Sequence, residues 1–221
     1  VNYDRTVGST RMQANVHLQL ESLHNQNNSA GEECMLPSDP VVSIGPKVRE
    51  YLGFDLDATE EELSQRSEIA HALISGCKGA MKRGTLGTYE LANTRCHIIE
   101  IDAEGGIAAL KALPGAIRAA SATILTSTLI EQKEQCSVLE PVMSVEVSVP
   151  SDIVGTVLSD MTTRRGVIGE VIMGDEDTHG KALIHGQVPL AEILGYANTL
   201  RSITGGEGTF SAEYKGHSAC D

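Results

Sequence analysis

A glycine-rich turn, residues 205–208, is the stretch of this sequence that comes nearest to a phosphate-binding loop. In such loops the glycines follow a strand and open a helix, whose first N–H groups hold the phosphate. Here the glycines follow an expected helix and precede an expected strand, so we interpret them as a helix end and a turn. The chain contains no GxxxxGKS or GxxxxGKT motif, and we do not expect these residues to hydrolyse GTP.

An acidic segment, residues 174–180, could offer carboxylates and His179 to a cation. It lacks the central glycine and the terminal glutamate of a calcium loop, so a solvated hairpin turn is the expected structure. The seven histidines are scattered and the five cysteines form no C-x-x-C pair, so we expect neither a metal site nor a disulfide framework. No serine lies in a G-x-S-x-G elbow, and no catalytic residue is predicted.

Arg164 and Arg165 form a basic pair at the end of an expected helix, directly before Gly166. Cations at a helix C-terminus compensate the helix dipole, which is the simplest interpretation of this pair. It is also the only basic dipeptide expected to be exposed in an acidic second half of the chain. If this half meets RNA, we expect phosphate to be bound by this pair, Lys181 and Arg201.

The overall composition limits the classes of function. A net charge of −13 argues against a free-standing nucleic-acid binder, although small basic patches could still meet RNA. Aromatic residues make up 3% of the chain and tryptophan is absent, so base-stacking platforms are not expected. No apolar run is long enough for a membrane span, and no signal or transit peptide is visible. Because the first residue is Val1, we expect the chain to be a fragment.

The first half of the chain mixes strands and helices. Residues 11–23 alternate between apolar and polar side chains, which indicates a half-buried strand. The further elements expected there are a polar insertion over about residues 24–62, a helical region from the N-cap Thr59 to Arg83 ended by Gly84, a strand over 96–101 and a long helix over 113–135.

The sequence of the second half indicates a more regular order of strands and helices. The expected elements are a strand over 142–149, a helix opened by Pro150 and ended by Gly166 in the left-handed conformation, strands over 167–173 and 181–188, a helix opened by Pro189 and a strand over 209–214. This βαββαβ order predicts a ferredoxin-like sandwich with both helices on one face of an antiparallel sheet. We therefore expect an α+β protein with domains at 1–137 and 138–217, followed by a tail at 218–221.

The second domain resembles domain V of elongation factor G over essentially its whole length. The matching segments, in order and spacing, are Leu139-Glu140-Pro141-Val142-Met143, Arg164-Arg165-Gly166, Val188-Pro189-Leu190-Ala191-Glu192, Gly195-Tyr196-Ala197 and Leu200-Arg201-Ser202. The first domain resembles domain IV of the same family, which implies a left-handed βαβ crossover, and the insertion over 24–62 departs from that pattern. The Pro-Leu-Ala-Glu segment is similar to the bacterial and organellar members.

The tip loop of domain IV distinguishes members of this family. A typical translocase has a glycine-rich loop of the type G-G-R-G-Q-Y-G-H-V, whereas residues 4–12 here read DRTVGSTRM. That segment is more similar to the mitochondrial ribosome-releasing factor 2 branch. The resemblance implies that Gly8, Ser9, Thr10 and Arg11 contact the ribosome or its RNA, and we add Arg164, Arg165 and Arg201 as expected contacts.

The resemblance implies a ribosome-binding C-terminal fragment of a translational GTPase, most similar to those that disassemble mitochondrial ribosomes together with ribosome recycling factor. GTP and magnesium would bind to an upstream domain, so no cofactor is expected in this chain, which we expect to be a monomer without a membrane partner. A bacterial cytoplasmic or plastid protein is the alternative to a mitochondrial one. The alternative functions are tRNA–mRNA translocation, a ferredoxin-like module that senses small molecules, and a metabolic enzyme that shares the crossover fold.

Overall fold

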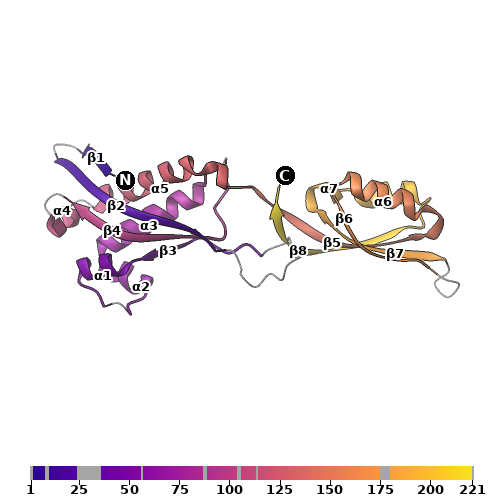
Figure 1. Cartoon of the computed structure of the whole chain (residues 1–221), viewed down its shortest axis with the longest axis horizontal. Helices are drawn as coiled ribbons and strands as arrows, with labels where there is room; N and C mark the ends of the chain where they lie inside the picture. The colour runs from indigo at the N-terminus through magenta and orange to yellow at the C-terminus, as the bar shows by residue number, and fades with distance from the viewer. Residues whose placement is uncertain are drawn as a thin grey trace. The chain divides into compact units, whose positions relative to one another are not determined.

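The computed structural model describes residues 2–7, 10–23, 36–55, 57–86, 89–103, 106–112, 114–174 and 180–220. The chain divides into two compact units, which hold the elements of residues 2–135 and 139–219 (Figure 1). Each unit has its own four-stranded sheet and its own cluster of buried apolar side chains. The expected α+β class with two separate folds is therefore confirmed.

The sheet of the first unit has the order β1-β2-β4-β3. Its strands are β1 (Asn2–Val7), β2 (Thr10–Ser22), β3 (Val41–Ile44) and β4 (Thr94–Ala103). Strands β3 and β4 are parallel, and the chain between them forms the helices α1 (Pro46–Leu52), α2 (Glu60–Arg66) and α3 (Glu68–Arg83). After β4 come α4 (Gly106–Ala112), α5 (Pro114–Glu131) and a short 3-10 helix, Lys133–Gln135.

Part of the expected insertion belongs to the core of this unit. Strand β3 and helix α1 lie inside residues 24–62, and their side chains Val42, Ile44 and Val48 are buried. The short extended piece that the sequence indicates at residues 41–44 is therefore present as β3, but the description of 24–62 as a polar insertion is wrong for this part, because its apolar side chains belong to the core. Residues 24–35 lie outside the described part of the chain. Thr59 does cap α2 as predicted, in a complete capping box with Glu62.

Strand β4 carries a bulge that changes which of its side chains face the core. His17 of β2 pairs with Glu100 and Leu18 pairs with Ile98, so Ile99 has no partner of its own. Before the bulge Cys96 and Ile98 are buried, and after it the inward positions shift to Ile101 and Ala103. An extra residue reverses the alternation of a strand, and the strand extends beyond the predicted residues 96–101 at both ends.

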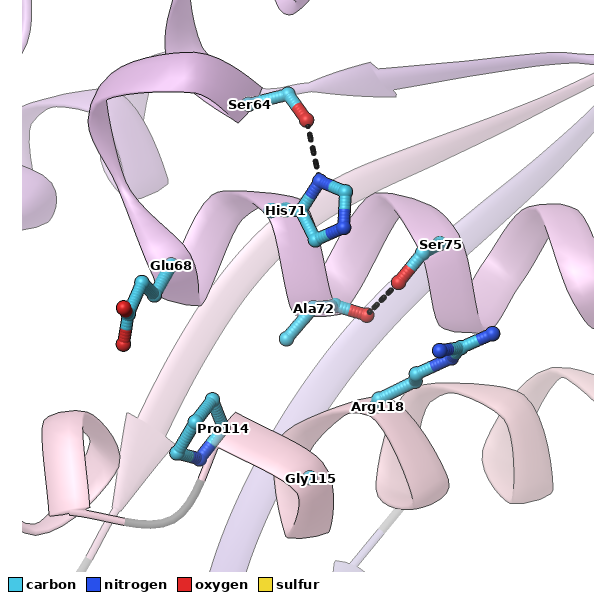
Figure 2. Close-up of a pocket in the computed structure, with 8 residues that line it drawn as sticks. All are labelled: Ser64, Glu68, His71, Ala72, Ser75, Pro114, Gly115 and Arg118. Carbon is cyan, nitrogen blue, oxygen red and sulfur yellow. Dashed lines mark hydrogen bonds between the residues drawn. The ribbon is translucent and has the colours of Figure 1, made fainter.

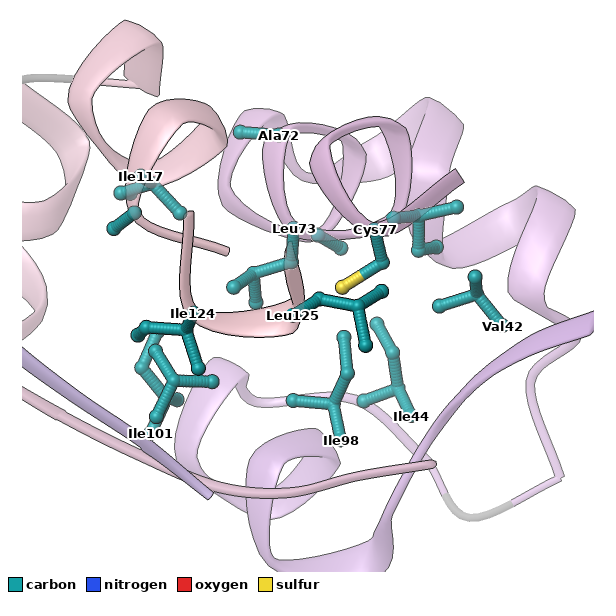
Figure 3. Packing of buried hydrophobic residues seen from close by; sticks show 14 of the residues in the cluster. Val42, Ile44, Ala72, Leu73, Cys77, Ile98, Ile101, Ile117, Ile124 and Leu125 are labelled. Atoms are coloured by element: carbon teal, nitrogen blue, oxygen red, sulfur yellow. The ribbon is translucent and has the colours of Figure 1, made fainter. Parts of the chain in front are cut away.

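Helices α3 and α5 pack closely over the sheet of the first unit (Figures 1 and 3). At Gly76 of α3, an added Cβ would lie 2.1 Å from the hydroxyl oxygen of Ser121 in α5, so only glycine permits this approach. Below the contact, Leu73, Cys77, Leu125 and the strand residue Ile98 are fully buried. The Cys77 thiol hydrogen bonds to Cys96, and this contact, together with burial, raises the pKa of Cys77 far above its usual range.

The sheet of the second unit has the order β6-β7-β5-β8, and its neighbouring strands are antiparallel. Its strands are β5 (Leu139–Pro150), β6 (Val167–Ile172), β7 (Lys181–Pro189) and β8 (Thr209–Ala219). Its helices are a 3-10 turn, Ser151–Ile153, followed by α6 (Val154–Thr163), α7 (Leu190–Ile193) and α8 (Tyr196–Ile203). The βαββαβ prediction is confirmed, but β8 includes residues 218 and 219, which were expected in a tail.

Three local predictions in the second unit are wrong. Pro150 and Pro189 are the last residues of β5 and β7, so the helices begin after them and not at them. The left-handed residue at the end of α6 is Arg165, with φ 57°, and not Gly166. Gly166 is needed for a different reason, because a Cβ there would lie 2.6 Å from the carbonyl oxygen of Met161. The acidic residues 175–179 lie outside the described part of the chain.

No single helix among the described residues is long and apolar enough to cross a membrane. The sharply bent pair α4 and α5 passes the same test by length and composition alone. Both of these helices contribute buried side chains to the core of the first unit, among them Leu110 and Leu125.

Candidate functional site

Arg164 fastens the end of α6 to α7. Its Nε donates to the Asp160 carboxylate at 2.9 Å, and its Nη1 donates to the carbonyl oxygen of Glu192 at 2.7 Å. Its guanidinium carbon also lies 5.0 Å from the centre of the Tyr196 ring, within the range of a cation–π contact. The side chain is 23% exposed. The prediction of an exposed basic pair is therefore wrong for Arg164, because its donors already have partners inside the unit.

Arg165 joins three segments of the second unit. Its Nη1 and Nη2 donate to the two carboxylate oxygens of Glu140, at 2.6 and 3.0 Å, near the start of β5. Its Nε donates to Glu192 of α7 at 3.3 Å. The hydrogen bond from Arg165 holds the pKa of Glu140 below its ordinary value of 4.5, and the same contact raises the pKa of Arg165. Two carboxylates thus bind the Arg165 guanidinium. The main role of this side chain is to cross-link segments of the second unit.

Arg201 and Lys181 are placed differently from this pair. Arg201 lies in the last turn of α8 and is exposed, and Lys181 is exposed at the start of β7. Neither has an ion-pair partner among the residues that the structure describes. Of the cations that the sequence singled out in the second unit, these two are the ones available to an external phosphate.

The four tip residues are only partly described. Gly8 and Ser9 lie outside the described residues, whereas Thr10 and Arg11 begin β2. The backbone pairs Val7 with Thr10, so two residues separate β1 from β2. Thr10 and Arg11 belong to the first unit, and Arg201 belongs to the second.

A hollow of about 640 Å³ between α2, α3 and the start of α5 was not predicted from the sequence. Five of the eight residues that line it have polar or charged side chains (Figure 2): the lining is Ser64, Glu68, His71, Ala72, Ser75, Pro114, Gly115 and Arg118. The His71 Nδ1 lies 2.9 Å from the Ser64 hydroxyl, and Ser75 donates to the carbonyl oxygen of Ala72 at 3.2 Å. No sequence signal could have revealed this set, because its members lie about fifty residues apart and follow no motif.

A second hollow, of about 430 Å³, lies over the outer face of the first sheet. There the Ser43 hydroxyl is 2.6 Å from Nδ1 of His97, and Arg95 pairs with Glu21 at 3.5 Å. A hydrolytic triad would need a carboxylate that orients the histidine, and no described carboxylate contacts His97. Within the described residues there is also no group of three or more His, Cys, Asp and Glu side chains that could hold a metal ion.

Comparison with known proteins identifies a matching family and similar sequences. Residues 137–221 match the family described as "Elongation factor G C-terminus". The chain is 32% identical over 168 residues to "Elongation factor G 2" of Vibrio vulnificus, which covers 76% of this chain and 23% of that protein. It is 35% identical over 143 residues to "Elongation factor G" of Aquifex pyrophilus, which covers 65% of this chain and 19% of that protein.

A protein of known structure also has a similar fold. A crystal structure of a protein from Thermus thermophilus superposes with a TM-score of 0.61 at 21% identity, over 99% of this chain and 27% of that one. The chain spans less than a quarter of the length of the curated relatives described above. The second unit matches the C-terminal family of elongation factor G, and the chain as a whole is similar to bacterial elongation factor G proteins.

Proposed function

We propose that this chain is the ribosome-binding C-terminal part of a translational GTPase that disassembles mitochondrial ribosomes together with ribosome recycling factor. The observation that carries the proposal is the pair of units in this order, with the elongation factor G C-terminal family matched over the whole second unit. In the proposal, GTP and magnesium bind to a part of the parent protein that lies outside this chain. The parent acts as a monomer with the ribosome as its main partner.

The chain's proposed role is mechanical. The first unit would act as a lever, and the second would hold the protein at the large subunit, as the family resemblance implies. A change of nucleotide in the GTPase part can move the lever only if the two nucleotide states make different contacts with the ribosome. Arg201 and the start of β2 are the places where this chain would make such contacts.

The connection between β1 and β2 favours recycling over translocation. These strands are joined within residues 4–12, DRTVGSTRM, which lack the glycine-rich pattern of a translocase and are more similar to the ribosome-releasing factor 2 branch. This difference supports a protein that does not follow the messenger and transfer RNAs through the decoding centre.

One assay distinguishes ribosome recycling from translocation. The full-length parent protein is mixed with mitochondrial ribosomes, GTP and ribosome recycling factor, and both subunit splitting and translocation are measured. We expect splitting that requires GTP and the recycling factor, with translocation at background. Robust translocation without splitting would show a translocase, the second candidate. If the protein supports neither reaction and does not sediment with ribosomes, the proposed function is wrong. Imaging of the tagged endogenous protein tests the mitochondrial location.

A further inference from the structure

We propose that the hollow between α3 and α5 binds a phosphate group, with Arg118 as its cation. The inference deepens the proposed function, and rests on it, where the phosphate belongs to an RNA backbone. The other source of the same chemistry is a small phosphorylated molecule. The proposal stands on a hollow, on side chains from two helices and on the charge around them.

The donors come from both walls of the hollow. Arg118 projects from α5, is exposed, and has no ion-pair partner among the described residues (Figure 2). His71 projects from α3, and because its Nδ1 contacts Ser64, its Nε2 is the nitrogen left to meet a ligand. A guanidinium and an imidazole nitrogen on opposite walls suit the several oxygens of one phosphate.

The backbone of α5 adds to these donors. The first N–H groups of a helix have no partner within the helix, and Pro114 occupies the first position of α5. The next residue, Gly115, lines the hollow, and a Cβ built there would meet nothing within 4 Å. An oxygen atom of a ligand can therefore approach the main chain at this point without displacing a side chain.

No acidic residue offsets the positive end of α5. Like several helices of this chain, α5 has none in its first turn, and it carries Arg118 in its second turn. Two positive features next to each other repel, and an anion between them would relieve this repulsion. Glu68 is the lining residue whose negative charge opposes anion binding, and it lies at the far end of the hollow from Arg118 in Figure 2.

The hollow lies at the end of the first unit that also holds two of the expected ribosome contacts. β4 ends at Ala103, which pairs with Ala14, and α4 leads from there into the start of α5 (Figure 1). The hollow is therefore at the end of the unit where β2 begins, with Thr10 and Arg11. One RNA strand could supply phosphate to both places.

The test is a titration of the whole chain with inorganic phosphate, followed by the NMR shifts of backbone amides. We expect shifts centred on Gly115 and Ala116. Arg118→Ala should weaken the affinity by about threefold to tenfold, the range for a charged hydrogen bond at an exposed site. Glu68→Gln should strengthen it. The matched control is Lys111→Ala, which removes the same charge from an exposed position of α4 that does not line the hollow.

A second arm uses a fluorescent single-stranded RNA of about 12 nucleotides, long enough to occupy one site of the usual size. If RNA is the ligand, Arg118→Ala lowers the slope of log affinity against log salt by about one, and Lys111→Ala does not. Binding of phosphate through Arg118 without RNA binding would identify a small phosphorylated molecule as the ligand. Equal behaviour of the Arg118 and Lys111 variants in both arms would overturn the proposal. Because no ribosome is used, this result does not depend on the outcome of the splitting assay.

Discussion

The two units use arginine at helix ends in opposite ways. In the second unit Arg164 and Arg165 follow the C-terminus of α6 and are held by carboxylates and a carbonyl oxygen. In the first unit Arg118 lies near the N-terminus of α5 and has no ion-pair partner among the described residues. A cation is stabilised at the first kind of position and destabilised at the second. The direction of the helix thus separates arginines that hold the fold from one that is available to a ligand.

The largest expected effect concerns the independence of the two units. Ile98 and Ile184 are fully buried in separate clusters, so each substitution by alanine should destabilise its own unit by about 2–5 kcal/mol. Calorimetry of the whole chain should then show one transition move for Ile98→Ala and the other for Ile184→Ala. Both transitions moving together in both variants would contradict two independent cores.

The next largest effect tests the close contact that shapes the hollow of the first unit. Gly76→Ala places a Cβ 2.1 Å from the Ser121 hydroxyl oxygen, and we expect a loss of about 1–3 kcal/mol from overpacking. Gly79→Ala is the matched control in the same helix, because its Cβ would meet nothing within 4 Å. That control should stabilise the helix by up to about 1 kcal/mol. Chemical denaturation measures both, and equal effects would show that α3 and α5 are not in tight contact.

The arginine cross-link of the second unit should show itself in the pH dependence of stability. The pKa of Glu140 is lowered by Arg165, so the pair stabilises the folded state above about pH 4.5. As the pH falls below 4.5 and through the lowered pKa, Glu140 is protonated and this contribution is lost. Arg165→Ala should therefore be less stable than the parent at neutral pH and approach it in acid. A difference that grows on acidification would exclude this role.

The smallest effect on stability is expected at Arg201, where binding should change instead. Because the side chain is exposed in the last turn of α8, Arg201→Ala should alter the free energy of unfolding by less than about 0.5 kcal/mol. Co-sedimentation of the parent protein with ribosomes should nevertheless weaken, and the difference from the unsubstituted protein should shrink as salt rises. Lys215→Ala, which removes one charge from β8 in the same unit, is the control. Equal sedimentation of the two variants would remove Arg201 from the expected contacts.

The two units also differ in how far the sequence predicts them. The second follows simple rules, since Val145, Val147 and Val149 alternate inward along β5 and the order of elements is regular. In the first unit, the bulge at Ile99 and the short strand β3 break the alternation on which such rules depend.

The candidate sites were predicted less well than the fold. The sequence drew attention to Arg164 and Arg165 but could not show that Glu140, 25 residues away, occupies the second of them. The sequence also did not indicate the hollow, because Arg118 and His71 line it together only once α3 and α5 pack against each other. Long-range pairing of side chains depends on the tertiary structure, which local patterns do not encode.

The position of β5 in its sheet has a consequence for the order in which the protein folds during its own synthesis. β5 is the first strand of the second unit, yet one of its two neighbours is β8, the last. Until residues 209–219 have left the ribosome, one side of β5 lacks its backbone partners, and such exposed strand edges invite wrong pairing. The first unit has no such delay, since its described strands precede residue 104. A newly made chain is thus expected to hold a finished first unit and an open second sheet until residues 209–219 have left the ribosome.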